Sequence, residues 1–128
     1  MLTTSNDIRI GKGFGHAGNL QPPPLMMDEA INQEMDFRLR EIMKSRALTP
    51  LFQPIVDLAS GTIGGYEGLI RGPSNSPLHS PLQLFRAAAL CHRGVAVEHL
   101  CRRVTLESFA KLRLPGDLFL NVSPDCLL

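Results

Sequence analysis

The spacing of apolar side chains predicts an amphipathic helix over residues 28–47. Two oppositely charged pairs, Glu34 with Arg38 and Asp36 with Arg40, are four positions apart and can form ion pairs on the polar face. The apolar positions recur at steps of three and four: Ile31, Met35, Leu39, Ile42 and Met43. We expect this face to pack against the domain, with partner docking or a linker role as the alternative.

Two strands are predicted next, over residues 51–58 and 62–71. Pro50 separates them from the helix, because the residue before a proline avoids the helical conformation. Pro54 lacks an amide hydrogen and therefore confines the first strand to a sheet edge or to a position outside the ladder. The small and polar residues 59–61 predict a turn between the two strands.

The second half of the chain opens with a strong helix start. Ser80 can cap a helix in which Pro81 takes the first position and Gln83 completes a capping box. We expect this helix to run to about residue 93 and to stop at Gly94.

A further helix over residues 97–113 and a strand over residues 118–122 complete the prediction. A strand that returns after helices indicates a right-handed crossover and a parallel strand pair, so the fold class is α/β. Two or three strands do not make a parallel sheet that is covered on both faces. We therefore expect the chain to form part of a larger α/β fold.

The composition narrows the functional classes. The chain has 128 residues, 44% hydrophobic and 20% charged, with a net charge of +1, as expected for one globular domain. Without a basic stripe, a DNA or RNA polymer is not an expected partner. No apolar run approaches the roughly 18 residues of a membrane span. Three cysteines without C-x-x-C spacing favour a reducing, cytoplasmic location, and we expect Cys91 and Cys101 to be unreactive.

Residues 1–27 differ from the rest of the chain, because glycines and three consecutive prolines dominate them. Such a stretch buries too little apolar surface to offset the entropy of ordering it, which predicts a flexible leader. Residues 13–18 match the pattern G-x-G-x-x-G, but that pattern binds a dinucleotide only between a strand and a helix. We interpret the match as a coincidence.

The second predicted strand carries the most informative side chains. Alternation along a strand places Glu67, Leu69 and Arg71 on one face, about 6 to 7 Å apart. A carboxylate can hold a metal ion, an apolar group can contact a base or sugar, and a guanidinium can clamp a phosphate. The alternative is a solvated strand face with an ordinary Glu–Arg pair.

Asn121 lies at the C-terminal end of the last predicted strand, where parallel barrels collect functional groups. Its amide oxygen can ligate a hard divalent cation, or the side chain can instead satisfy the turn at residues 123–124. We expect Glu98 and His99 to lie on a helix surface, and no residue is assigned a catalytic role.

Three segments of the chain occur in a characteristic order. They are Phe-Gln-Pro-Ile-Val-Asp at residues 52–57, Gly-Gly-Tyr-Glu-Gly-Leu-Ile-Arg at 64–71 and Leu-Phe-Leu-Asn-Val-Ser-Pro at 118–124. Together they resemble the motifs of the EAL domain family, bacterial phosphodiesterases that act on cyclic di-GMP. The resemblance covers residues 48–128.

This resemblance implies a TIM-like (β/α) barrel whose mouth holds two Mg²⁺ or Mn²⁺ ions and hydrolyses cyclic di-GMP to linear pGpG. It implies that Glu67 and Asn121 ligate metal and that Leu69 and Arg71 contact the dinucleotide. It also suggests that Gln53 lies near the substrate. Two metal ions would activate water and neutralise phosphate charge.

The sequence departs from the family pattern in two ways. Gly68 stands where the family has alanine, and we expect only modest loosening of the backbone there. A complete barrel needs about 250 residues, and the family's later metal carboxylates and its lysine have no counterpart in this chain. The chain therefore corresponds to the first third of an EAL domain, an incomplete barrel with the first strands and helices only.

The expected function is that of a truncated cyclic di-GMP phosphodiesterase domain. The alternatives are a catalytically inactive EAL-like domain that serves as a cyclic di-GMP receptor or protein-interaction module, and an unrelated small α/β adaptor. In the intact protein we expect a homodimer or an attached cyclase or sensor domain as possible partners.

Overall fold

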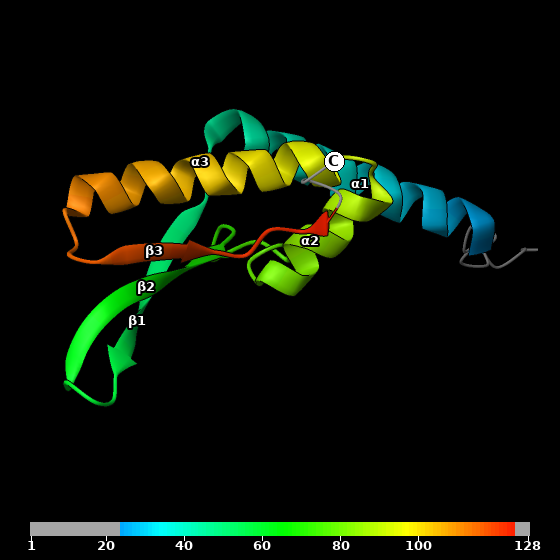
Figure 1. Ribbon diagram of the computed structural model, residues 1–128. Helices are drawn as coiled ribbons and strands as arrows, with labels where there is room; N and C mark the ends of the chain where they lie inside the picture. Colours follow the sequence, from blue (N-terminus) through cyan, green and yellow to red (C-terminus); the bar gives the residue numbers. More distant parts are fainter. Residues whose placement is uncertain (1–23, 125–128) are drawn as a thin grey trace, which may run out of the picture.

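A computed structural model describes residues 24–124, and Figure 1 shows the arrangement of its elements. In chain order these are α1 (Pro24–Ser45), β1 (Thr49–Asp57), β2 (Thr62–Arg71), α2 (Pro81–Leu90), α3 (Gly94–Leu112) and β3 (Asp117–Leu120). Each predicted helix and strand is present, in the predicted order, so the α/β class is confirmed for this part of the chain. The G-x-G-x-x-G match, Cys126 and most of the predicted leader lie outside the described residues.

The boundary between leader and first helix was predicted wrongly. α1 begins at Pro24, so residues 24–27 are helical rather than part of the leader. Proline suits the first helical position, where its missing amide hydrogen needs no partner. The proline run therefore marks the start of the helix.

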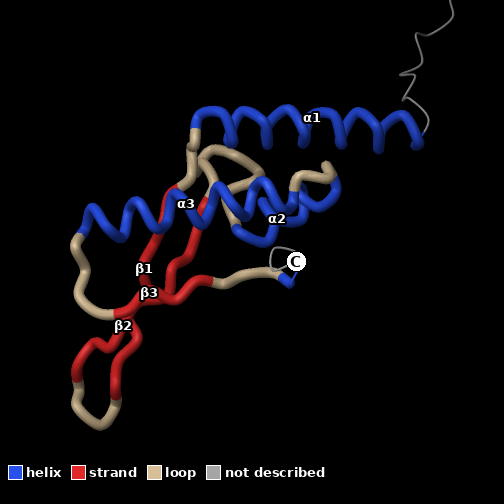
Figure 2. Tube along the Cα trace, turned by 45° about the horizontal axis from the view of Figure 1, so that its top comes forward, coloured by secondary structure: helices blue, strands red, loops and turns tan. Residues whose placement is uncertain are grey.

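The three strands form one mixed sheet in the order β1-β2-β3. β1 and β2 are an antiparallel hairpin, whereas β2 and β3 are parallel, as the sequence predicted. α3 lies along one face of this sheet, and the tip of the hairpin projects beyond the helices (Figures 1 and 2). At that tip Leu58 is 95% exposed.

The core lies where the three helices meet the end of β2. The predicted apolar face of α1 contributes Leu39 and Ile42, whereas Ile31 near its start is exposed. The buried hydrophobic residues are Leu39, Ile42, Leu48, Ile70, Leu78, Leu84, Ala87, Ala88, Val97 and Cys101. The core thus anchors one end of the sheet and leaves the hairpin tip outside.

The start of α2 matches the prediction, but its end does not. Ser80 Oγ accepts a hydrogen bond from the backbone N–H of Gln83 at 3.3 Å and so caps the helix. The helix ends three residues before the predicted position 93, and Gly94 begins α3 instead of ending α2. His92, with φ of 53°, takes the left-handed conformation in the turn between the helices.

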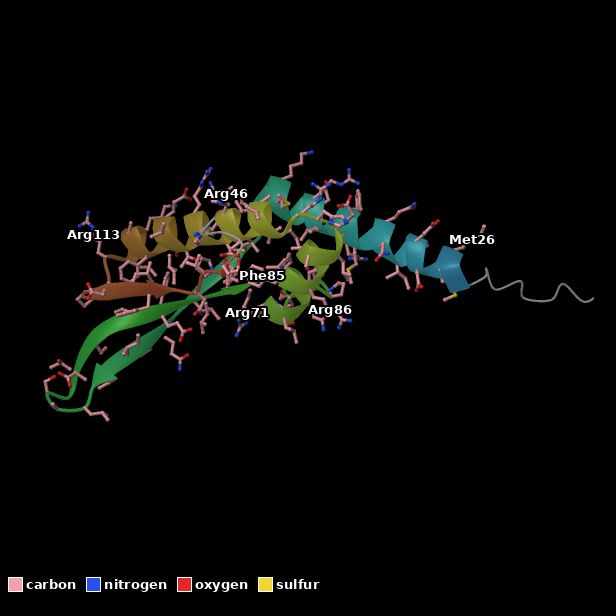
Figure 3. All side chains as sticks on the ribbon, turned by 45° about the vertical axis from the view of Figure 1, so that its right-hand side comes forward. Met26, Arg46, Arg71, Phe85, Arg86 and Arg113 are labelled. Carbon is pink, nitrogen blue, oxygen red and sulfur yellow. The ribbon has the colours of Figure 1, made fainter. Side chains whose placement is uncertain are left out.

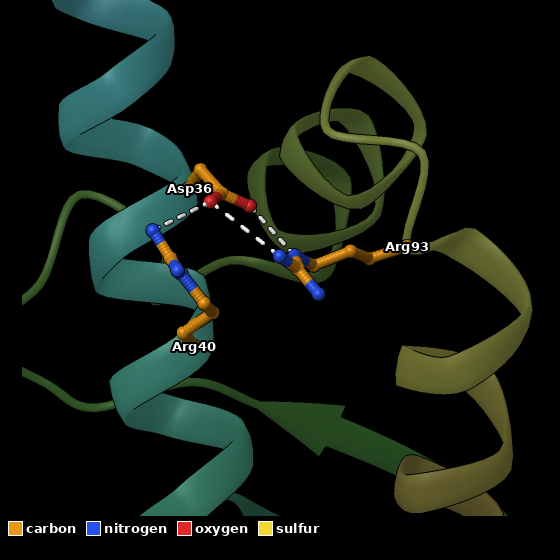
Figure 4. A network of polar contacts seen from close by, with 3 residues as sticks. All are labelled: Asp36, Arg40 and Arg93. Atoms are coloured by element: carbon orange, nitrogen blue, oxygen red, sulfur yellow. Dashed lines mark hydrogen bonds and ion pairs between the residues drawn. The ribbon is translucent and has the colours of Figure 1, made fainter.

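Polar contacts join α1 to the start of α3 (Figure 4). Arg93 Nε lies 2.6 Å from Asp36 Oδ1, and Arg40 Nη2 lies 2.9 Å from Asp36 Oδ2. The hydrogen bond from Arg93 lowers the pKa of the Asp36 carboxyl below its usual value. Glu34 and Arg38 also pair, at 2.8 Å, so both ion pairs predicted along the helix form.

Gly68 lies where β2 is closest to α3. A Cβ atom at this position would lie 2.8 Å from Thr105 Cγ2 on α3 and 2.9 Å from Leu120 Cδ2 on β3. The glycine therefore permits close approach of the helix to the sheet, because real Cβ atoms essentially never come this near to another heavy atom. A side chain at position 68 would therefore require the Thr105 and Leu120 side chains to move.

Candidate functional site

β2 presents the predicted row of residues on the face of the sheet opposite to α3. Gly68 points toward α3, as its closeness to Thr105 shows. Side chains alternate along a strand, so Glu67, Leu69 and Arg71 lie together on the other face. The shared face predicted for these three residues is confirmed.

Asn121 reaches this row from the end of β3. Its Nδ2 donates a hydrogen bond to Glu67 Oε1 at 2.8 Å. The parallel register explains the contact, because Glu67 pairs with Phe119 and the next residue on the same face of the chain is Asn121. The structure therefore brings together the two residues that the family resemblance named as metal ligands.

Gln53 joins the same face from β1. In the antiparallel register its Cα partner is Glu67, and directly opposite residues share a face with Cβ atoms about 5 Å apart. Leu51 is likewise the partner of Leu69. Gln53, Glu67 and Asn121 thus form a polar row across all three described strands, beside Leu69 and Arg71.

The Glu–Arg pair that the sequence left open as an alternative does not form. Arg71 Nη1 donates to the backbone oxygen of Ile70 at 2.9 Å. Of the ion pairs formed within residues 24–124, none joins Glu67 to Arg71. An acidic group and a basic group therefore share one face without pairing with each other.

The donor atoms suit a hard cation only in part. The carboxylate of Glu67 and the amide oxygen of Asn121 are ligands of the kind that Mg²⁺ and Mn²⁺ prefer. They would supply two of about six positions around such an ion. Among the described residues no three His, Cys, Asp or Glu side chains gather where they could hold a metal. The cation site that the family resemblance implies therefore stays a prediction.

Glu98 is a polar residue that sequence reasoning placed wrongly. It was expected on a helix surface, but it is only 8% exposed. Its carboxylate accepts hydrogen bonds from the backbone N–H and the hydroxyl of Ser123, just after β3. The signal was present in the spacing, because Glu98 begins a stripe with the buried Cys101 and Thr105 at steps of three and four.

A cavity of about 1180 Å³ adjoins the site between α2, α3 and the ends of β2 and β3. Leu69 and Asn121 belong to its lining, together with Phe85 of α2. Figure 3 shows Arg71 and Phe85 near α2 in the middle of the view, far from Arg113 at the end of α3. The open space therefore lies at the end of the sheet that carries the polar row.

The two described cysteines behave as predicted. Burial raises the pKa of the Cys101 thiol to about 11, and burial also raises the pKa of the Cys91 thiol. A thiol with a raised pKa carries little of the nucleophilic thiolate at neutral pH. These side chains therefore serve packing.

The sequence matches no protein-family model and no curated protein. In three dimensions, however, the chain is similar to the EAL domain of Xanthomonas citri FimX, solved in complex with c-di-GMP. The TM-score is 0.65 at 15% sequence identity, over 79% of this chain and 40% of that chain. The chain has the fold of part of an EAL domain.

The EAL-like fold extends over three strands and three helices of the described residues. The chain spans 40% of the length of the FimX domain, and the predicted incomplete barrel stays a prediction. Within residues 24–124 no helix is both long enough and apolar enough to cross a membrane.

Proposed function

We propose that this chain forms the N-terminal part of an EAL-like domain that binds cyclic di-GMP on the sheet face opposite to α3. The observation that carries the proposal is the 2.8 Å contact between Asn121 and Glu67, with Gln53 opposite Glu67 on β1. The c-di-GMP in the FimX structure supports the choice of ligand. In a complete domain, we propose that the reaction is hydrolysis of cyclic di-GMP to linear pGpG.

Each residue of the row has a chemical task in this proposal. The guanidinium of Arg71 would clamp a phosphate, because its planar donors match two phosphate oxygens. Leu69 would contact a base or sugar, and the Gln53 amide would donate or accept a hydrogen bond beside it. Glu67 and Asn121 would hold Mg²⁺ or Mn²⁺. When bound, such ions would activate water and neutralise phosphate charge.

A second function, that of a cyclic di-GMP receptor without catalysis, is favoured by the incomplete cation site. Glu67 is the only acidic residue in the polar row, and residues 24–124 place no three acidic, His or Cys side chains together for a metal. Two oxygen ligands cannot fix two hard cations. We therefore expect the 128-residue chain to bind the dinucleotide without hydrolysing it.

The proposal is tested by the affinity of the chain for cyclic di-GMP, measured by isothermal titration calorimetry in the presence of Mg²⁺. Arg71→Ala should weaken binding by about 1.5 to 3 kcal/mol, the size of a hydrogen bond to a charged group. Arg103→Ala is the matched control, because Arg103 is an exposed arginine on α3, away from the site.

Two results would contradict the proposal. Equal affinities for the Arg71→Ala and Arg103→Ala variants would show that Arg71 does not contact the dinucleotide. A folded wild-type chain without affinity for cyclic di-GMP would show that this face is not the binding site. Release of linear pGpG by the purified chain would instead exclude the receptor role and show that the ligands present suffice for hydrolysis.

A further inference from the structure

Glu98 is the buried acidic residue of the described chain, and its burial needs a physical reason. The other buried polar residue, Thr105, satisfies itself within the helix, because its hydroxyl donates to the backbone oxygen of Cys101 at 2.8 Å. Glu98 contacts another part of the chain instead. A carboxylate is costly to bury unless hydrogen bonds compensate its lost hydration, so its partner identifies its role.

That partner is Ser123. Glu98 Oε1 accepts from the Ser123 backbone N–H at 2.8 Å, and Glu98 Oε2 accepts from the Ser123 hydroxyl. Two bonds to one residue restrain both its position and its rotation. A carboxylate suits this geometry because both of its oxygens accept and both Ser123 groups donate.

The segment that Glu98 holds lies beyond the paired residues of the sheet. The ladder between β2 and β3 ends at the pair Gly68 and Leu120. Asn121 follows directly, and Ser123 lies two residues beyond it. The backbone that carries the Asn121 side chain is thus fixed at one end by the ladder and at the other end by Glu98.

We propose that Glu98 is a positioning residue that holds the Asn121 amide against Glu67 through Ser123. Glu98 binds Ser123 and Glu67 binds Asn121, so both carboxylates determine where one amide points. The assignment of this amide to a cation or dinucleotide site rests on the proposed function, but the positioning itself does not.

The test measures hydrogen exchange of the Asn121 side-chain NH₂ group in the full chain without ligand. In a sample labelled with ¹⁵N-asparagine, the side-chain NH₂ resonances of Asn121 are assigned by their loss in Asn121→Asp. The hydrogen bond to Glu67 should slow exchange of one of these protons with water. We expect Glu98→Ala to abolish this slow exchange, because the segment after Leu120 is then released.

Val97→Ala is the matched control, because Val97 is buried beside Glu98 in the same helix but is not among the partners of Ser123. It should lower stability while leaving the Asn121 exchange slow. Slow exchange that survives in Glu98→Ala would overturn the proposal. So would its loss in Val97→Ala to the same degree, or its absence from the wild-type chain. If Glu98→Ala does not fold, Ser123→Ala is measured instead. It removes the hydroxyl bond and keeps the backbone bond, so the exchange should become faster without reaching the unprotected rate, and exchange as slow as in the wild type would overturn the proposal.

A second arm separates this proposal from the proposed function. If the site binds a cation, the affinity for Mn²⁺ should fall roughly 10- to 100-fold in Glu98→Ala, as for other residues that orient a ligand. If the wild-type chain binds no Mn²⁺ but keeps the slow exchange, the proposed cation binding fails while the positioning role of Glu98 stands.

Discussion

The two faces of the β1–β2–β3 sheet are built from alternate residues of the same strands, yet one packs against α3 and the other is open. On the α3 side, the rings of Phe52 and Tyr66 lie 5.4 and 6.1 Å from the ring of Phe109, and Gly68 lets the helix approach. On the other side, Phe119 is 52% exposed beside Glu67. Packing holds the first face, and the second carries the polar row that the proposed function assigns to a ligand.

The difference teaches that one strand can pack against a helix with alternate residues while the residues between them form the candidate site. Tyr66 and Gly68 pack against α3, whereas Glu67 and Leu69 between them face away. Substitutions that alternate along β2 should therefore alternate in effect between stability and binding. This contrast can be tested.

The largest effect is expected for Phe109→Ala on the packed face. It removes both aromatic contacts and should lower the free energy of unfolding by about 2 to 4 kcal/mol. Phe119→Ala on the open face should cost less than about 1 kcal/mol, because that ring is already half exposed. Urea denaturation followed by circular dichroism measures both. Equal losses in the two variants would remove the distinction between the faces.

A smaller loss is expected for Gly68→Ala, which places a methyl group against α3. Thr105 Cγ2 and Leu120 Cδ2 would have to shift, at about 1 to 3 kcal/mol of unfolding free energy. Gly64→Ala in the same strand is the control, because the nearest atom there is 3.9 Å away. Thr105→Ser removes the obstructing methyl group and should recover part of the loss in the double variant.

Recovery of the unfolding free energy in the double variant tests the cause of the loss more directly than the Gly68→Ala variant alone. If the Gly68→Ala variant is destabilised but Thr105→Ser gives no recovery, the close approach of α3 is not the cause. A Gly68→Ala variant as stable as the wild type would show that the helix lies farther from the sheet in solution.

The smallest effect is expected for Asp36→Asn and concerns stability at acidic pH. Because the pKa of Asp36 is lowered in the folded chain, this group stabilises the fold above its unfolded pKa of about 3.9. The contribution disappears as the pH falls through the lower folded pKa. Asp36→Asn should therefore reduce the decline in melting temperature below about pH 4. Hydrogen bonds in its turn also lower the pKa of Asp57. Part of the decline in melting temperature should therefore remain in the Asp36→Asn variant. An unchanged pH profile in the variant would contradict the contact between Asp36 and Arg93.

Local rules predicted most of the elements. The 3.6-residue period located α1, and the caps around Ser80 located the start of α2. The errors fall at boundaries. The sequence predicted Gly94 as a helix stop because glycine favours left-handed turns, but His92 takes that conformation instead. Neighbouring packing decides such ends, and a propensity of less than about 1 kcal/mol does not outweigh it.

The sequence by itself determined which residues of β2 share a face, because alternation with period two is a property of the strand alone. It also carried the motifs that named Glu67 and Asn121. Only the tertiary structure decided that Gln53 stands opposite Glu67, that Asn121 reaches Glu67, and that Glu98 lies buried against Ser123. These are contacts between segments 14 to 54 residues apart in the chain. Strand register and the placement of α3 set them, and the alternation along a single strand fixes neither.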